Sequence, residues 1–169
     1  SCEMTLSEML TIMVLFHVSP CKVFKYFYVF YLTHLHNKDF PKLLSYNRFV
    51  QLMPRLFVPL CVLLQSLFGE ETGIYIADST ALPVCHNKRI NRNRVFKGLA
   101  ARGKTTMGWF YGLKLHLVIN HKGSIVAVKI TPANVDERTL LDEMTQNLKG
   151  SLFADKGFIS QDLFKKLFQ

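Results

Sequence analysis

The spacing of apolar residues divides the chain into two parts with different periods. Up to about residue 68, apolar side chains recur at the three- and four-residue spacing of helices. This pattern predicts one helix from a Thr5 or Ser7 cap to Val18 and a second over 22–36, with Ser19-Pro20 as the break. A further helix begins at a Ser45 cap, and Pro54 and Pro59 should kink or interrupt it. An aromatic stripe on the second helix is typical of a packed core, and it comprises Phe24, Phe27, Tyr28 and Tyr31.

After residue 73 the apolar residues alternate with a period of two, which predicts strands. The expected elements are a strand over 73–78, a long loop, a hairpin of strands over 110–119 and 125–130, a helix from Asp136 to Gly150, a strand over 152–155 and a helix after Ser160. The first hairpin strand should be half-buried. Its core face should hold Leu113, Leu115, Leu117 and Ile119, opposite Lys114 and His116.

Composition narrows the function classes. The chain has 169 residues, 49% of them hydrophobic, and a formal net charge of +9, so we expect a folded protein with an acidic partner. The four cysteines lie far apart without a CxxC pair, which argues against a zinc knuckle or a disulfide scaffold and favours reduced thiols in the cytoplasm. The longest apolar run, 56–64, contains a proline and is shorter than the roughly 20 residues of a membrane helix, so no membrane partner is expected.

Two aspartates are the candidate catalytic residues. Asp78 and Asp155 each follow a short apolar run, and each precedes a turn-forming sequence. Carboxylates at the ends of neighbouring strands are suited to hold the two divalent ions of phosphodiester chemistry, because the sheet fixes their spacing. The alternative, that each aspartate only caps the next turn, is weakened because residues 79–135 contain ten Lys or Arg and no Asp or Glu. A polyanion, most simply nucleic acid, is the expected partner.

Several longer strings resemble bacterial insertion-sequence transposases of the DDE type. They are Ile76-Ala77-Asp78-Ser79-Thr80, Lys97-Gly98-Leu99-Ala100, the segment 108–116, Phe153-Ala154-Asp155-Lys156-Gly157-Phe158, and Ser45-Tyr46-Asn47-Arg48-Phe49 in the helical part. The likeness extends over about residues 3–169. It implies an α/β fold, an incomplete ribonuclease H-like mixed sheet over 73–169, preceded by an all-α region over 1–68.

The resemblance also implies a chemistry. Asp78 and Asp155 match the two aspartates with which the family binds catalytic Mg²⁺ (or Mn²⁺), and a homodimer acting on transposon ends and target DNA is a possible assembly. The family's third ligand is a Glu on a helix beyond a further strand, and the sequence stops before both. We therefore expect a fragment that is inactive alone. Glu143 and the acid at position 162 should lie on solvated helix faces, and Asp136 is better explained as a helix cap.

The segment 85–97 is too charged for a core and close in sequence to Asp78. We expect it to bind the DNA backbone, with 102–106 extending it as a flexible stretch of donors. The candidate DNA-binding residues are Asn87, Lys88, Arg89, Arg92, Arg94, Lys97, Arg102, Lys104 and Lys156. The spacing of 102–106 does not fit a phosphate-binding Walker loop. Trp109 could stack on a base, but a single Trp entering a strand is usually packed.

Three other functions remain open. A non-catalytic DNA-binding remnant would keep the basic segment without cleavage, and a ribonuclease H-like nuclease would cleave without strand joining. A membrane-surface protein would use the same positive charge on anionic lipid.

Overall fold

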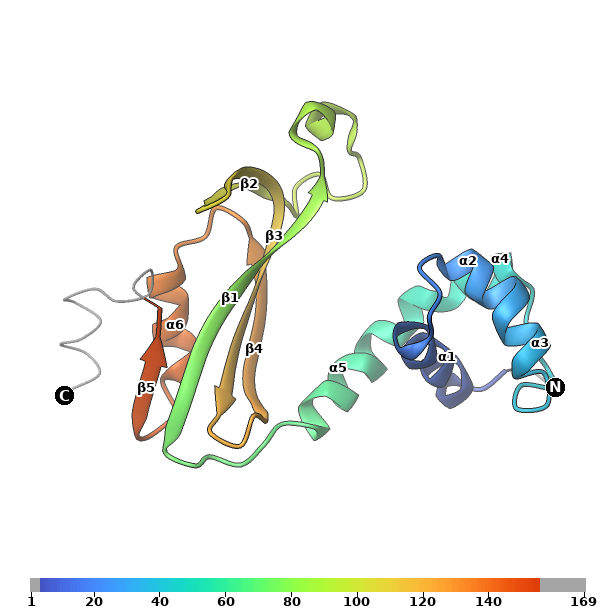
Figure 1. The fold of residues 1–169 in the computed structure, drawn as a ribbon, viewed down its shortest axis with the longest axis horizontal. Coiled ribbons are helices and arrows are strands. Elements are labelled where there is room, and N and C mark those ends of the chain that lie inside the picture. The colour runs from blue at the N-terminus through green and yellow to red at the C-terminus, as the bar shows by residue number, and fades with distance from the viewer. Residues whose placement is uncertain (1–3, 156–169) are drawn as a thin grey trace. The chain divides into compact units, whose positions relative to one another are not determined.

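The structure is a computed structural model that describes residues 4–155, drawn in Figure 1. It divides the chain into two compact units, Ser1–Leu67 and Phe68–Gln169. The helix expected after Ser160 and the candidate DNA contact Lys156 lie outside the described residues.

The first unit is helical, as the spacing predicts. Helix α1 (Leu6–Val18) begins at a capping box, in which Thr5 Oγ1 accepts from the Glu8 amide at 3.2 Å and Glu8 accepts from the Thr5 amide at 2.6 Å. The second predicted helix forms as α2 (Phe24–Tyr26), a π-helical segment η1 (Phe27–Leu32) and α3 (Thr33–Leu35). The aromatic stripe packs in the core as expected.

The third helical stretch combines α4 (Tyr46–Leu52), the 3₁₀ segment η2 (Met53–Leu56) and α5 (Phe57–Ser66). Ser45 caps α4 as predicted, and Pro54 lies in the 3₁₀ interruption. Pro59 does not interrupt, because in the first turn of α5 its missing amide is not needed by the helix.

By length and composition, Tyr46–Ser66 as a whole is apolar enough to cross a membrane, with a mean hydropathy of 1.4. This differs from the expectation that no segment is long enough, because the run does not stop at Pro59. Core helices of water-soluble proteins meet the same criterion.

The second unit is a mixed sheet with one helix. Its strands are β1 (Ile74–Cys85), β2 (Ala101–Thr105), β3 (Gly108–Asn120), β4 (Ile125–Pro132) and β5 (Ser151–Ala154). β3 pairs antiparallel with β1, β2 and β4, whereas β5 pairs with β1 in parallel. Among the described residues β5 lies at one edge of the sheet. An α/β mixed sheet preceded by an all-helical region confirms the predicted ribonuclease H-like class.

Helix α6 (Glu137–Thr145) packs on one face of this sheet, seen beside β5 in Figure 1. The core beneath it contains Tyr75, Ala77, Val118 and Leu141. Gly150 leads into β5 with a φ of +131°, and a Cβ there would lie 2.1 Å from the carbonyl oxygen of Gly73. This close approach lets the Ser151 amide donate to Gly73 O at 2.8 Å and start the parallel pairing.

The predicted orientation of β3 is wrong. His116 is buried beneath α6, and the side chain of Lys114 is only 12% exposed. The leucines expected in the core point to the opposite face, together with Ile76, Ile130 and Phe153, which are exposed. Strict alternation indicated a strand correctly, but α6 covers the polar side, where the polar groups pair with one another.

Three boundaries also differ from expectation. β1 continues to Cys85 instead of ending at Asp78, because β3 still pairs with it. Most of the segment expected to be flexible, 102–106, lies in strand β2, and its Gly103 fits against Ala133, whose oxygen a Cβ would approach to 2.4 Å. Helix α6 ends at Thr145, well before Gly150.

Candidate active site

Asp78 lies where the parallel ladder of β1 ends. β1 pairs with β5 over Ile74–Ala77, while its antiparallel pairing with β3 continues beyond Asp78. The Ser79 amide donates to Asp78 Oδ1 at 2.8 Å. One carboxylate oxygen is thereby oriented by the chain itself, and the side chain is exposed on the face opposite α6.

Asp155 follows β5 at the equivalent level. Ala77 pairs with Ala154 in the parallel register, so Asp78 and Asp155 are the next residues on neighbouring strands. Neighbouring strands lie about 4.8 Å apart, and residues at the same level of a parallel pair share a face. The register therefore places the backbones of Asp78 and Asp155 at neighbouring positions, and the alternation of β1 puts the Asp78 side chain on the face that α6 does not cover.

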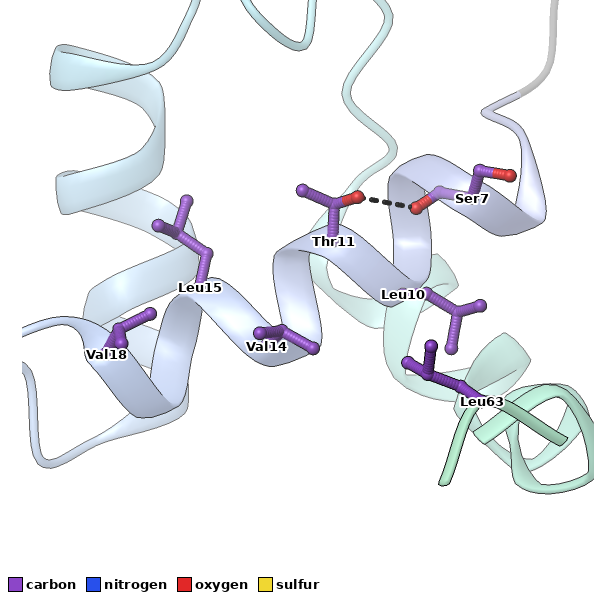
Figure 2. A pocket seen from close by; sticks show the side chains of 7 residues that line it. All are labelled: Ser7, Leu10, Thr11, Val14, Leu15, Val18 and Leu63. Carbon is purple, nitrogen blue, oxygen red and sulfur yellow. Dashed lines mark hydrogen bonds between the residues drawn. The ribbon is translucent and has the colours of Figure 1, made fainter. Parts of the chain in front are cut away.

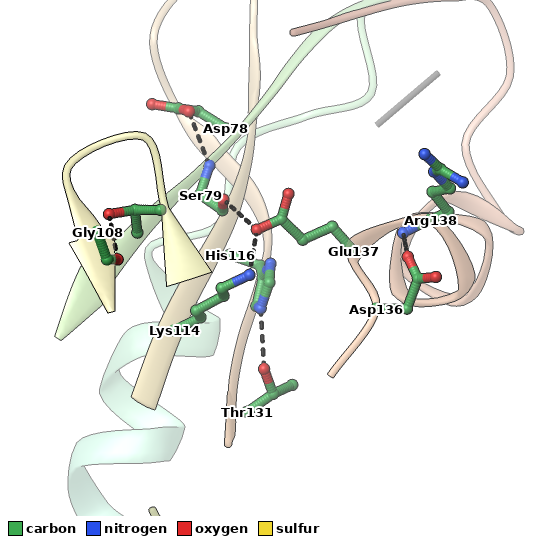
Figure 3. A network of polar contacts seen from close by, with 10 residues as sticks. Asp78, Ser79, Gly108, Lys114, His116, Thr131, Asp136, Glu137 and Arg138 are labelled. Carbon is green, nitrogen blue, oxygen red and sulfur yellow. Dashed lines mark hydrogen bonds and ion pairs between the residues drawn. The ribbon is translucent and has the colours of Figure 1, made fainter. Parts of the chain in front are cut away.

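A polar cluster lies under α6, on the other side of β1. Glu137 Oε1 accepts from Lys114 Nζ at 2.7 Å and from Ser79 Oγ at 3.1 Å (Figure 3). The side chains of Lys114 and Glu137 are 12% and 21% exposed. Asp136 caps the helix, as predicted, by accepting from the Arg138 amide at 2.9 Å. Glu137 is thus engaged on the covered face and is not a third carboxylate beside Asp78.

His116 adds a neutral, buried member to this cluster. Its Nε2 lies 2.9 Å from Thr131 Oγ1, and its Nδ1 is buried with no hydrogen-bond partner among the described residues. Burial lowers the pKa of His116 below its ordinary value, with Lys114 and Lys129 acting in the same direction and Glu137 against it. A neutral imidazole therefore fills this position at neutral pH.

The fit of the two aspartates to a metal is partial. Hard carboxylate oxygens are the ligands that Mg²⁺ and Mn²⁺ prefer. Within residues 4–155, however, no group of three or more His, Cys, Asp or Glu could hold an ion. Glu143 pairs with Lys129 at the helix surface, as its predicted solvated position implies. Asp78 and Asp155 thus remain two candidate ligands, fewer than such a group needs.

The basic segment is held to the sheet instead of forming a free loop. It contains the 3₁₀ helix η3 (Asn87–Arg92), capped by His86, and a turn fixed by Asn93, whose Oδ1 accepts from the Phe96 amide at 3.1 Å. Asn87 Nδ2 donates to the Trp109 carbonyl at 2.8 Å, so one donor expected to contact DNA is used within the fold. The segment is therefore a fixed platform next to β3.

The positive charges on this platform remain available. The predicted contacts Lys88, Arg89, Arg92, Arg94, Lys97, Arg102 and Lys104 are all exposed. None of them takes part in an ion pair within the described part of the chain. Five such cations on the platform and two on β2 suit a phosphate backbone.

Trp109 is not packed, contrary to expectation. Its side chain is 63% exposed, and it lines a hollow of about 280 Å³ with Asn87 and Arg102. Lys104 pairs with Trp109 across the β2–β3 ladder, and Lys104 Nζ lies 6.0 Å from the centre of the indole ring. This hollow joins the only tryptophan of the sequence to the basic platform.

A hollow in the first unit has a different character. It occupies about 440 Å³ beside α1 and is lined mainly by aliphatic side chains, with Leu63 from α5 (Figure 2). Its two polar residues are Ser7 and Thr11, and Thr11 Oγ1 donates to the Ser7 carbonyl at 2.8 Å. With no charged residue in its lining, this hollow does not suit a phosphate.

A mixed sheet with two candidate carboxylates near the end of its parallel ladder, beside a basic platform, is typical of enzymes that process polynucleotides. The sequence matches the family described as the transposase DDE domain over residues 68–169, which is more than half of the chain. The chain belongs to this family of nucleic-acid-cleaving transposases. Comparisons with curated proteins and with solved structures gave no match.

Reasoning from sequence missed the cluster of Ser79, Lys114, His116, Thr131 and Glu137. One signal was present in the chain, because Lys114 and His116 interrupt an otherwise apolar strand at every second position. Residues at positions i and i+2 of a strand point to the same face of the sheet. Polar side chains at both positions on a covered face need hydrogen-bond partners from the helix that covers it.

Proposed function

We propose that this chain is the DNA-processing part of a transposase, which cuts a phosphodiester bond at a transposon end and joins the freed 3′ hydroxyl to target DNA. The pairing of Ala77 with Ala154, which sets Asp78 and Asp155 at one level, carries the proposal. Bacterial DNA in the cytoplasm is the proposed substrate, and a second copy of the chain is the proposed partner.

In this proposal, DNA binding and catalysis depend on different residues. The platform cations would hold the phosphate backbone, and Asp78 and Asp155 would hold Mg²⁺ or Mn²⁺ through their carboxylate oxygens. When bound, such ions activate the attacking oxygen and stabilise the leaving oxygen. The Ser79 amide supports one orientation of Asp78, which keeps an oxygen directed away from the sheet.

Nicking of a supercoiled plasmid in the presence of Mn²⁺ or Mg²⁺ tests the catalytic part. We expect Asp78→Asn and Asp155→Asn each to lower nicking by more than the roughly 10- to 100-fold typical of outer-shell changes at metal sites. Asp136→Asn is the matched control, because Asn caps a helix as well as Asp and nicking should persist. Binding to a labelled duplex, followed by anisotropy, should survive all three substitutions.

Two results would contradict this assignment. Metal-dependent nicking that survives Asp78→Asn would place the chemistry elsewhere. Tight DNA binding by the wild-type chain without any nicking would agree with the expectation that the chain is inactive alone and would favour the DNA-binding remnant, since both functions need the platform. Joining of a 3′ end separates transposase from nuclease, and sedimentation with anionic liposomes tests the membrane-surface alternative that the positive charge suggests.

A further inference from the structure

The hollow at Trp109 has features that backbone binding does not require. Phosphate contacts need cations, whereas this hollow presents an exposed indole beside Arg102, with Lys104 Nζ 6.0 Å from the centre of the ring. An exposed Trp is unusual on a surface unless its ring meets a partner, because burying its face is strongly favourable. The chemistry is that of a stacking platform for a nucleobase.

The neighbouring residues fit the same ligand. Arg102 and Lys104 lie on the same side of β2 as Trp109 on β3, because residues paired across an antiparallel ladder share a face. A nucleotide whose base stacks on Trp109 would have its phosphate within reach of these cations. The hollow, at about 280 Å³, lies just below the roughly 300 Å³ at which drug-sized pockets begin, so it suits a single ring system.

Asn87 supplies a second, independent observation. Its Nδ2 is bound to the Trp109 carbonyl, and its Oδ1 is buried with no donor among the described residues. Unsatisfied buried oxygens are uncommon and call for an explanation. An amino group on a bound base could satisfy this oxygen after a small side-chain shift.

We propose that Asn87, Arg102, Lys104 and Trp109 form a site for one unpaired nucleobase of single-stranded or frayed DNA. The inference rests on the proposed function, because it assumes that DNA lies on the basic platform. It goes further by assigning a base-stacking role to one residue. A fully paired duplex keeps its bases stacked and would contact only the cations.

The single tryptophan makes the site directly observable, because all tryptophan fluorescence of the full chain comes from Trp109. Three unlabelled probes are titrated: a ten-nucleotide single strand, its duplex, and an abasic strand with the same backbone. We expect the single strand to quench fluorescence at the concentration where anisotropy of a labelled copy reports binding. The duplex and the abasic strand should bind through charge with little quenching.

Substitutions then separate stacking from charge. Trp109→Ala should weaken single-strand binding about ten-fold, as expected for loss of one stacked base, and change duplex binding less than about two-fold. Trp109→Phe keeps a ring and should recover part of the loss even if the alanine variant folds poorly. Met107→Ala is the control, because Met107 is 98% exposed in the same hairpin and lies outside the hollow.

These experiments can contradict the base-stacking site without contradicting the proposed DNA-processing function. Single-strand binding by anisotropy without fluorescence quenching, or equal quenching by the abasic strand, would overturn the base site while leaving DNA binding intact. An equal loss of single-strand and duplex affinity in Trp109→Ala would do the same. Absence of binding to every probe would overturn the proposed function, and the base site with it.

Discussion

The two faces of the β-sheet differ in an unexpected direction. The face under α6 contains Lys114, His116 and Thr131 together with its apolar core, whereas the uncovered face is mainly aliphatic apart from its aspartates. Polar groups are tolerated under the helix because Glu137 and Thr131 pair with them. The covered face of a strand is therefore decided by the element that packs on it, even where the more hydrophobic of the two alternating sets of side chains points to the other face.

Removal of an apolar side chain from the covered face should cause the largest decrease in the free energy of unfolding. Leu141 of α6 is 3% exposed and packs on the sheet, so Leu141→Ala should lower the free energy of unfolding by about 3 kcal/mol. Ile130→Ala is the matched change on the uncovered face, where the side chain is 58% exposed, and should cost less than about 1 kcal/mol. Urea unfolding followed by circular dichroism measures both, and equal losses would contradict the distinction between the faces.

Loss of the Lys114–Glu137 ion pair beneath α6 should cause the next largest decrease in the free energy of unfolding. Glu137→Ala leaves Lys114 mostly buried without its carboxylate, and we expect a loss of about 2 kcal/mol. Glu143→Ala removes the partner of Lys129 at the exposed edge of the same helix and should cost no more than about 0.5 kcal/mol. The same urea experiment compares the two. A double variant that also replaces Lys114 with Met should recover stability if the buried charge causes the loss.

His116 should make the covered face sensitive to acid. Its pKa is lowered in the folded state, so below its ordinary pKa of 6.5 the unfolded chain binds the proton more readily. The free energy of unfolding should therefore fall as the pH decreases from about 6.5 toward the folded-state pKa. His116→Asn should flatten this dependence. Thermal unfolding between pH 5 and 8 provides the measurement.

Charge on the uncovered face should leave stability almost unchanged. Phe153 is exposed on the edge strand β5, and Phe153→Lys should alter the free energy of unfolding by less than about 0.5 kcal/mol. It should reduce self-association, because lysine on an exposed edge opposes strand pairing between molecules. Light scattering at increasing concentration tests this. A loss of stability similar to that of Leu141→Ala would show that the face is covered in solution.

Local features of the fold were predictable from the sequence. Capping at Thr5, Ser45 and Asp136 depends on a few neighbouring residues, and the β3–β4 hairpin follows from its turn residues. The orientation of β3 was not predictable, because it depends on where α6 packs. β2 was missed because its polar residues carry little strand propensity and its pairing with β3 is set by the approach to Ala133.

The sequence indicated some residues of the candidate site and missed the surroundings of others. Asp78 and Asp155 were found from the sequence, although the expected end of β1 at Asp78 was wrong and only the parallel ladder ends there. Exposure of Trp109 and the engagement of Asn87 depend on contacts between segments distant in sequence. The assignment of the two aspartates as metal ligands stays a prediction.

The length of β1 sets the distance between Asp78 and the basic platform. One continuous strand joins Asp78 to Cys85, seven residues apart, and the basic platform begins immediately after it. At about 3.3 Å per residue this strand spans up to roughly 23 Å, against about 34 Å for one turn of B-form DNA. In the proposed function, β1 would therefore separate the cleaved bond from the bound phosphates by up to about two-thirds of a helical turn.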